Sequence, residues 1–159
     1  MSTREELDQL GWHIIDSQPQ TPFESAGLAN SGLPRSFPEL EIKMQMRGSD
    51  FDCALSSFLH EFYQHRDQRF FVDPPSQQLE PINRTALAGI AEYLSNRFHY
   101  PIPEWTRAPE FHLPEEHDWF ESQFDKEFLA TIRDFHVKDS APEFMRRNLI
   151  FSARGLIHI

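Results

Sequence analysis

Three stretches of the chain carry apolar residues at helical spacing. Apolar residues recur at intervals of three and four over residues 49–65, 81–98 and 118–136, as expected for one face of an α-helix. In the third stretch the apolar stripe consists of Phe120, Phe124, Phe128, Ile132 and Phe135. The pattern therefore predicts three long helices, with Ser49 and Asp118 as the N-caps of the first and the third.

The residues just before the first of these helices alternate with a period of two. Over residues 39–47, apolar Leu or Ile or Met positions lie between charged or amide positions, which predicts a β-strand. A lone strand has to pair. Its partner is expected to be the segment 149–159 or a strand of a second molecule, so a homo-oligomer formed through residues 39–47 stays open.

The N-terminal part has a different composition. Thr3 and Glu6 fit a capping box that starts a helix over residues 4–15. Residues 17–38 are rich in Ser, Pro and Gly, which is typical of a linker or an extended arm. We therefore expect an N-terminal helix, linker and strand arm over residues 1–48 and a helical domain over residues 49–159.

The end of the chain is unusually apolar for a terminus. A second capping box, Ser140-Ala-Pro-Glu143, predicts a short helix. We expect the apolar residues that follow to pack on the body, as a strand beside residues 39–47. The fold class predicted is mainly α: a compact bundle of three to five helices with one or two short β-strands and an N-terminal arm. The predicted core contains Phe58, Leu59, Phe62, Leu94, Phe120, Phe124, Phe128 and Ile132.

Length and composition indicate an ordinary globular chain. It has 159 residues, 15 Phe and a single cysteine, Cys53, so neither an internal disulfide nor a multi-cysteine zinc site is expected. The charged N-terminus lacks the apolar region of a signal peptide, and no apolar run is long enough for a bilayer. We expect a cytoplasmic protein without a membrane partner.

The charge is strongly acidic and unevenly distributed. The net charge is −10, which disfavours nucleic acid as a partner. Residues 104–127 hold eight acidic residues against two basic ones, whereas residues 144–159 hold three arginines and no acid. This pattern predicts an acidic patch that either pairs with the tail or binds a basic partner. The residues predicted to bind a partner are Glu104, Glu110, Glu115, Glu116, Asp118, Glu121, Arg146 and Arg147.

Candidate chemistry is sparse. His60 and His65 are five residues apart, so their rings diverge by about 140° on a helix and could not share a metal. His112 and His117, with Glu115 and Glu116 between them, could hold zinc or iron in a loop, but no further ligand is in register, which favours a wet surface loop that leads into the next helix. Cys53 lies among apolar helix positions, which favours a buried thiol over a nucleophile. We therefore predict no catalytic residue, no metal and no cofactor.

Short motifs in the rest of the chain follow one another in a set order. They are Phe51-x3-Leu55-x2-Phe58-Leu59-x-Glu61-Phe62-Tyr63, Pro101-x-Pro103-x-Trp105, Asp118-Trp119-Phe120, and Ala141-Pro-Glu-Phe-Met-Arg-Arg-Asn-Leu-Ile-Phe151. Over about residues 49–159 the chain thus resembles a class of small bacterial helical proteins encoded next to nucleotidyltransferase-like toxin genes. The resemblance implies an antitoxin-like role with such a toxin as partner, and it supplies no catalytic residues.

The function predicted is that of a non-enzymatic protein-interaction module, antitoxin- or immunity-like, which neutralises or regulates a partner protein. Two alternatives stay open. One is a small metal-dependent hydrolytic enzyme that uses the loop from His112 to His117, and the other is a structural subunit of a larger assembly. The acidic patch favours binding over catalysis, and so does the absence of a catalytic motif.

Overall fold

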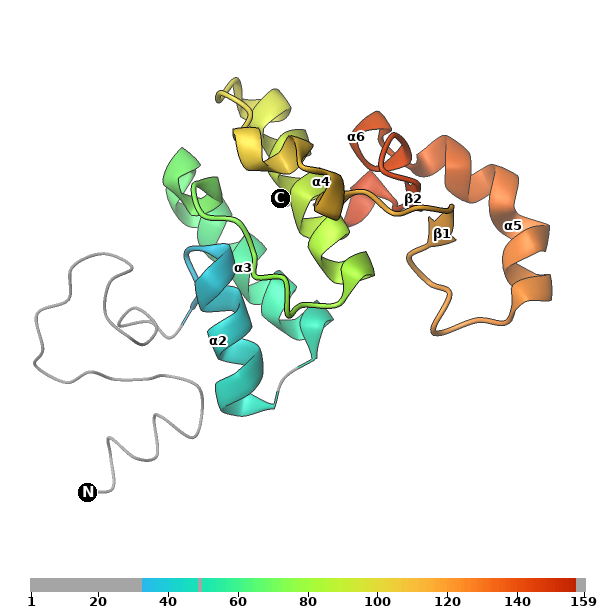
Figure 1. Ribbon diagram of the computed structural model, residues 1–159, viewed down its shortest axis with the longest axis horizontal. Helices are drawn as coiled ribbons and strands as arrows, with labels where there is room; N and C mark the ends of the chain where they lie inside the picture. Colours follow the sequence, from blue (N-terminus) through green and yellow to red (C-terminus); the bar gives the residue numbers. More distant parts are fainter. Residues whose placement is uncertain (1–32, 49, 157–159) are drawn as a thin grey trace, which may run out of the picture. The chain divides into compact units, whose positions relative to one another are not determined.

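The computed structural model describes residues 33–48 and 50–156 and is mainly helical, as the sequence predicts (Figure 1). The chain divides into two compact units, Met1–Pro75 and Ser76–Ile159, called unit 1 and unit 2 below. The helix expected over residues 4–15 and most of the arm lie outside the described residues. The division into an arm of residues 1–48 and a domain therefore stays a prediction.

Residues 39–47 form a helix, so the predicted strand is wrong. Helix α2 spans Phe37–Arg47 and begins at Ser36, whose Oγ accepts the N–H of Glu39 at 3.2 Å. The Glu39 carboxylate in turn accepts the N–H of Arg35 at 3.1 Å. Two satisfied N–H groups and a proline in the first turn start a helix that the alternation of apolar residues does not suggest. The strand edge that motivated self-association through residues 39–47 is thereby removed.

Unit 1 is built round phenylalanine rings that contact one another. α2 packs on α3 (Phe51–His65), and the 3₁₀ helix η1 (Gln68–Phe71) follows. The fully or almost fully buried rings are Phe37, Phe58, Phe62, Phe70 and Phe71. Ring centroids lie 4.9 Å apart between Phe37 and Phe58 and 5.0 Å apart between Phe62 and Phe71. α3 is confirmed within one or two residues, with Asp50 rather than Ser49 as its N-cap.

Unit 2 is organised on α4 (Pro81–Phe98), whose predicted bounds are confirmed. Every residue from 85 to 91 is buried, and so is the predicted core residue Leu94. The short α6 (Pro142–Met145) and the 3₁₀ helices η2 (Glu104–Arg107) and η3 (Pro109–Phe111) pack on it. α6 begins at Ala141 without a side-chain cap, so the N-cap role predicted for Ser140 is wrong.

The C-terminal segment packs into unit 2. The strand β2 (Leu149–Ile150) pairs in parallel with β1 (His117–Asp118), and the 3₁₀ helix η4 (Ala153–Leu156) follows. Buried side chains of this segment are Leu149, Ile150, Phe151 and Leu156. The tail is therefore core, as predicted, but its strand partner is β1 and not residues 39–47.

The third long helix begins later than predicted and faces outward. α5 spans Lys126–Asp139 with Asp125 as N-cap, while Asp118 lies in β1. None of its 14 side chains, all within the described range, is buried. Phe124 and Phe128 are exposed and Phe120 and Ile132 are half-buried, so the core positions predicted at these four residues are wrong. In the described residues, no helix is long and apolar enough to cross a membrane.

Some of the predicted core residues are buried and others are exposed, and this difference gives a stability test. Phe62→Ala removes a fully buried ring and should lower the free energy of unfolding by about 3–5 kcal/mol. Phe128→Ala, at a ring that is 45% exposed, should cost less than about 1 kcal/mol. Urea unfolding of the intact chain measures both. A Phe128→Ala loss as large as that of Phe62→Ala would place α5 in a core.

Glu39 makes the stability of the chain depend on pH. Burial raises the pKa of Glu39 from 4.5 to about 7, against the smaller lowering effect of Arg35. Between these two pH values the folded chain holds a proton that the unfolded chain releases, so stability falls as pH rises through this window. The loss should be roughly 3 kcal/mol, because one pKa unit corresponds to about 1.36 kcal/mol.

Glu39→Gln should flatten the fall in stability between pH 4.5 and 7, since the amide keeps the hydrogen-bond acceptor and cannot titrate. Glu80→Gln, at an exposed position, is the matched control and should leave the slope as it is. The measurement is urea unfolding across this pH range. An unchanged slope in Glu39→Gln would show that another group causes it.

Candidate functional site

Helix α5 is attached to unit 2 by polar contacts at its middle. Arg133 donates two hydrogen bonds to Glu116, at 2.9 and 2.6 Å, and these hydrogen bonds lower the pKa of that carboxyl. His136 Nδ1 lies 2.8 Å from Asp118 Oδ2, and both side chains are mostly buried. These two pairs tie the helix to the loop and strand that precede it.

The C-terminal end of α5 is attached in the same manner. Asp139 accepts hydrogen bonds from the Ser152 hydroxyl and from Arg154 Nε, the latter at 2.8 Å. The Ser152 hydroxyl, and after it Arg154, lower the pKa of Asp139. Ser140 also forms a β-bridge with Ser152. Charged and hydroxyl groups thus hold α5 at its middle and at its C-terminal end.

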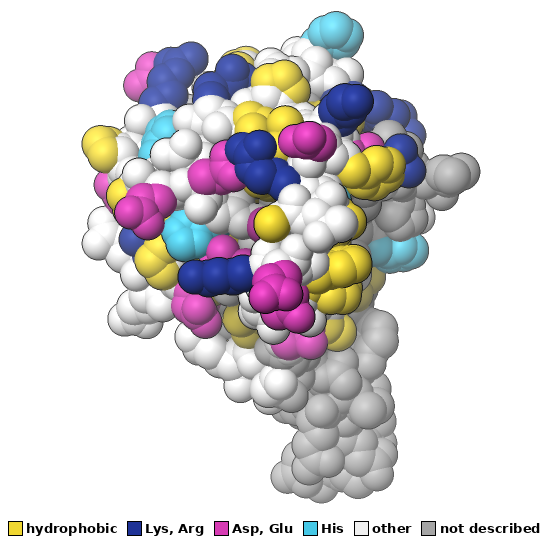
Figure 2. Space-filling view, turned by 90° about the vertical axis from the view of Figure 1, so that its right-hand side faces the viewer, with side chains coloured by type: hydrophobic (Ala, Val, Ile, Leu, Met, Phe, Trp, Pro, Cys, Tyr) yellow, Lys and Arg dark blue, Asp and Glu magenta, His cyan; other side chains and the backbone are white. Residues whose placement is uncertain are grey.

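The apolar stripe of α5 and of the turn before it is exposed at Phe124, Phe128 and Phe135 and half-buried at Phe120 and Ile132. The exposed fractions of Phe124, Phe128 and Phe135 are 45%, 45% and 63%. The first three rings follow one another, with centroid distances of 6.1 Å between Phe120 and Phe124 and 5.1 Å between Phe124 and Phe128. Figure 2 looks onto the side where α5 lies in Figure 1 and shows hydrophobic side chains at the surface among charged ones. We call Phe120, Phe124, Phe128, Ile132 and Phe135 the aromatic stripe.

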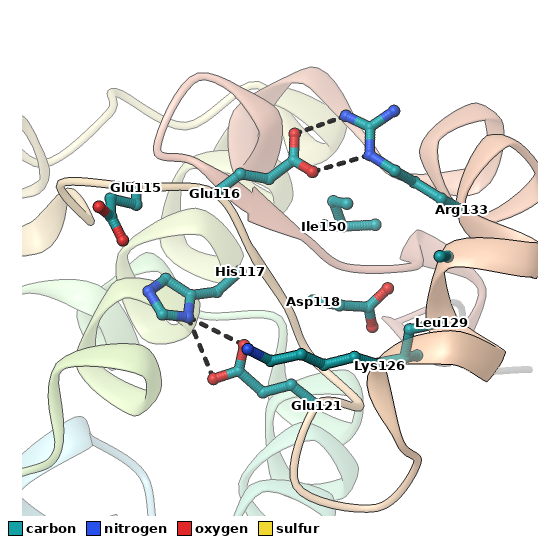
Figure 3. Close-up of a pocket in the computed structure, with 10 residues that line it drawn as sticks. Glu115, Glu116, His117, Asp118, Glu121, Lys126, Leu129, Arg133 and Ile150 are labelled. Carbon is teal, nitrogen blue, oxygen red and sulfur yellow. Dashed lines mark hydrogen bonds and ion pairs between the residues drawn. The ribbon is translucent and has the colours of Figure 1, made fainter.

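A hollow of about 580 Å³ lies on another flank of α5 (Figure 3). Ile150 and Leu129 contribute apolar walls, and the remaining lining is mostly charged. Glu116 and Arg133 face each other on one side, and His117 Nδ1 lies 2.9 Å from Glu121 on another. We call this region the acidic hollow.

The structure brings together four of the predicted partner-binding residues. Those that line the acidic hollow are Glu115, Glu116, Asp118 and Glu121. Three of the four are paired within the molecule: Glu116 with Arg133, Asp118 with His136 and Glu121 with His117. Glu104 and Glu110 are exposed on η2 and η3, away from the hollow's lining, and Glu110 accepts a hydrogen bond from Gln77. The acidic surface is therefore partly neutralised within the molecule.

The two neighbouring arginines serve different purposes. Arg147 is 2% exposed; it donates to Glu92 on α4 and to the carbonyl oxygens of Glu143 and Thr106. Arg146 also donates to Glu92, at 2.9 Å, but its side chain is half exposed. Arg147 is thus an interior tie rather than a surface contact.

The predicted counter-charge of the tail is wrong. Arg146 and Arg147 pair with Glu92, and Arg154 pairs with Asp139. Both acids lie outside the stretch 104–127 that the sequence suggested. Glu92 and Asp139 were missed because each lies in a helix whose periodicity draws attention to its apolar residues. Glu92 could have been noticed because it is an acidic residue next to the apolar middle of a predicted helix, where a charged side chain needs a partner.

The residues considered for metal or covalent chemistry are placed apart or engaged elsewhere. His112 Nδ1 contacts the carbonyl oxygen of Ala108 at 3.0 Å, while His117 contacts Glu121. Among the described residues, no group of three or more His, Cys, Asp and Glu is placed to hold a metal ion. Cys53 is exposed, which corrects the prediction of a buried thiol.

The Asp118–His136 pair has the geometry of an oriented histidine, in which a carboxylate fixes the ring through Nδ1. A small hollow of about 190 Å³ beside it is also lined by Ser152. However, the Ser152 hydroxyl donates to Asp139. Within residues 33–48 and 50–156, no hydroxyl or thiol forms a hydrogen bond with the His136 ring. The pair joins α5 to β1.

Comparison of the chain with protein-family models, with curated proteins and with solved structures finds no match.

Arg147 and Arg146 provide a matched pair of variants. Arg147→Ala leaves the mostly buried Glu92 with a weaker partner and should lower the free energy of unfolding by about 3–5 kcal/mol. Arg146→Ala removes a half-exposed partner of the same carboxylate and should cost about 0–1 kcal/mol. Urea unfolding distinguishes the two, and equal losses would contradict the interior role of Arg147.

Proposed function

We propose that this chain is a non-enzymatic protein-interaction module that binds a partner protein through α5. One observation carries the proposal: a helix with an aromatic stripe along one side has no buried side chain in the described structure. The ordinary reason for such a stripe is burial in a core. Here polar contacts hold the helix instead, so its apolar side is left available for another protein.

The expected binding free energy is larger for the aromatic stripe than for the charged groups of the acidic hollow. Three half-exposed phenylalanines offer roughly 300 Å² of apolar surface, which corresponds to roughly 7 kcal/mol before the costs of association. Exposed ion pairs contribute about 0–1 kcal/mol each. The acidic side chains round the hollow should therefore govern selectivity and the rate of encounter, while the rings provide most of the affinity.

The specific form that we propose is an antitoxin- or immunity-like role, in which the module occludes a site on its partner. The motif order described above supports a nucleotidyltransferase-like toxin as that partner. The acidic balance of the chain supports a basic surface on it.

Site-specific photocrosslinking in the cells that produce this protein tests the proposal. A photoreactive phenylalanine analogue at position 128 should give a discrete covalent adduct with one protein, because the ring there lies on the aromatic stripe. The same analogue at Gln64, an exposed position of α3, is the control and should give no such adduct.

The adduct also has to depend on the stripe. Phe135→Ser should abolish it while leaving the unfolding transition unchanged, and the purified partner should bind the wild-type chain with a defined stoichiometry. Adducts that are the same at positions 64 and 128, or that persist in Phe135→Ser, would contradict binding through α5.

A further inference from the structure

The charges that surround the aromatic stripe indicate which kinds of side chain the partner carries. Residues 115–139, which include the acidic hollow, the turn and α5, hold eight acidic residues and three basic ones, a net charge of −5. One of the three basic side chains, Arg133, is already paired with Glu116. An apolar row in an acidic setting favours a ligand that combines apolar and basic side chains.

The spacing within the stripe fits a helix as the ligand. Phe128, Ile132 and Phe135 follow the i, i+4, i+7 pattern with which one helix packs along another. Glu127 and Asp134 each precede one of the two phenylalanines and so lie about 100° round the helix, on the same flank of the stripe. Both carboxylates belong to exposed residues, within reach of long basic side chains on a docked helix.

Two other candidates for covering the aromatic stripe, a second copy of the chain and its own residues 1–32, are acidic like the stripe's surroundings. A second copy of this chain would bring two surfaces of net charge −5 together. The chain's own residues 1–32 hold five acidic residues and one basic residue, a net charge of −4. Like charges across an interface oppose association, so neither is matched to this surface.

We propose that the aromatic stripe receives a basic amphipathic helix of another protein. Apolar side chains at i, i+3 or i+4, and i+7 of that helix lie against Phe128, Ile132 and Phe135. Its lysines or arginines lie beside Glu127 and Asp134. The inference rests on the proposed function and adds the chemical class of the partner's binding segment.

Three synthetic helical peptides of roughly 18 residues, about five turns, test this with the full chain. The first carries Leu and Ile at the docking positions and Lys on the flanks. The second keeps the apolar residues and replaces Lys by Glu, and the third keeps Lys and replaces the apolar residues by Ser. Binding is followed by fluorescence anisotropy of the labelled peptides.

The first peptide should bind at least about ten-fold more tightly than either of the others, a difference of about 1.4 kcal/mol. Phe135→Ser should weaken it by a similar factor, and so should Glu127→Gln combined with Asp134→Asn. Raising the salt from ~50 mM to ~500 mM should act in the same direction, because the flanking charges are exposed. Glu104→Gln, exposed on η2, is the control and should have no effect.

Equal binding of the basic and acidic peptides, or binding of neither, would overturn the basic helix as occupant. Self-association that Phe135→Ser abolishes, seen by sedimentation, would assign the stripe to a second copy and overturn it as well. The crosslinking experiment judges the proposed function separately. A partner captured at position 128 whose contacting segment is acidic would keep the proposed function and reject this inference.

Discussion

The arrangement of unit 2 depends on the contact between Gly89 and Phe144. A Cβ atom on Gly89 would lie 2.4 Å from Phe144 Cδ1, so only glycine lets the ring reach the backbone of α4. This close approach fixes α6 against α4, and the Arg147–Glu92 pair holds the next turn of chain to the same helix. Phe144 then stacks on Phe151 at 4.4 Å, and Phe151 contacts Trp119 at 5.0 Å.

The position of α5 follows from these contacts. The same C-terminal segment supplies β2, which pairs with β1, and Ser152 and Arg154, which hold Asp139. Asp118 of β1 pairs with His136. The rest of unit 2 therefore holds α5 mainly through hydrogen bonds and ion pairs of its polar side, while few of its apolar side chains pack against that unit. A helix attached in this manner can offer aromatic rings to a partner without unfolding any of the core.

The sequence predicts the helices better than it predicts what they face. The bounds of α4 and nearly those of α3 follow from periodicity, and the burial of Phe58, Phe62 and Leu94 follows with them. The stripe of α5 has the same periodicity, yet it is exposed. Periodicity shows that one side of a helix is apolar, and only tertiary contacts decide whether that side meets the chain's own core or the surface.

The error at α2 has a different origin. Ser36-Phe-Pro-Glu39 carries the same start signal as Ser140-Ala-Pro-Glu143, but the alternation that follows drew the prediction toward a strand. At the first site Ser36 caps an 11-residue helix, whereas at the second Ala141 begins a helix of four residues. The ion pairs of the candidate site could not be predicted either, because the partners of Arg133, His136 and Arg147 lie between 17 and 55 residues away.

Hydrogen–deuterium exchange of the intact chain tests most directly whether α5 is held without burial of its apolar side. Amides of α4 should exchange only through opening of unit 2, whereas those in the middle of α5 should exchange through local opening that disturbs few apolar contacts. We expect peptides from residues 126–139 to exchange at least about ten-fold faster than peptides from residues 81–98, a difference of about 1.4 kcal/mol in opening free energy. Equal protection of the two helices in the free chain would contradict the account, because it would mean that the aromatic stripe is already covered.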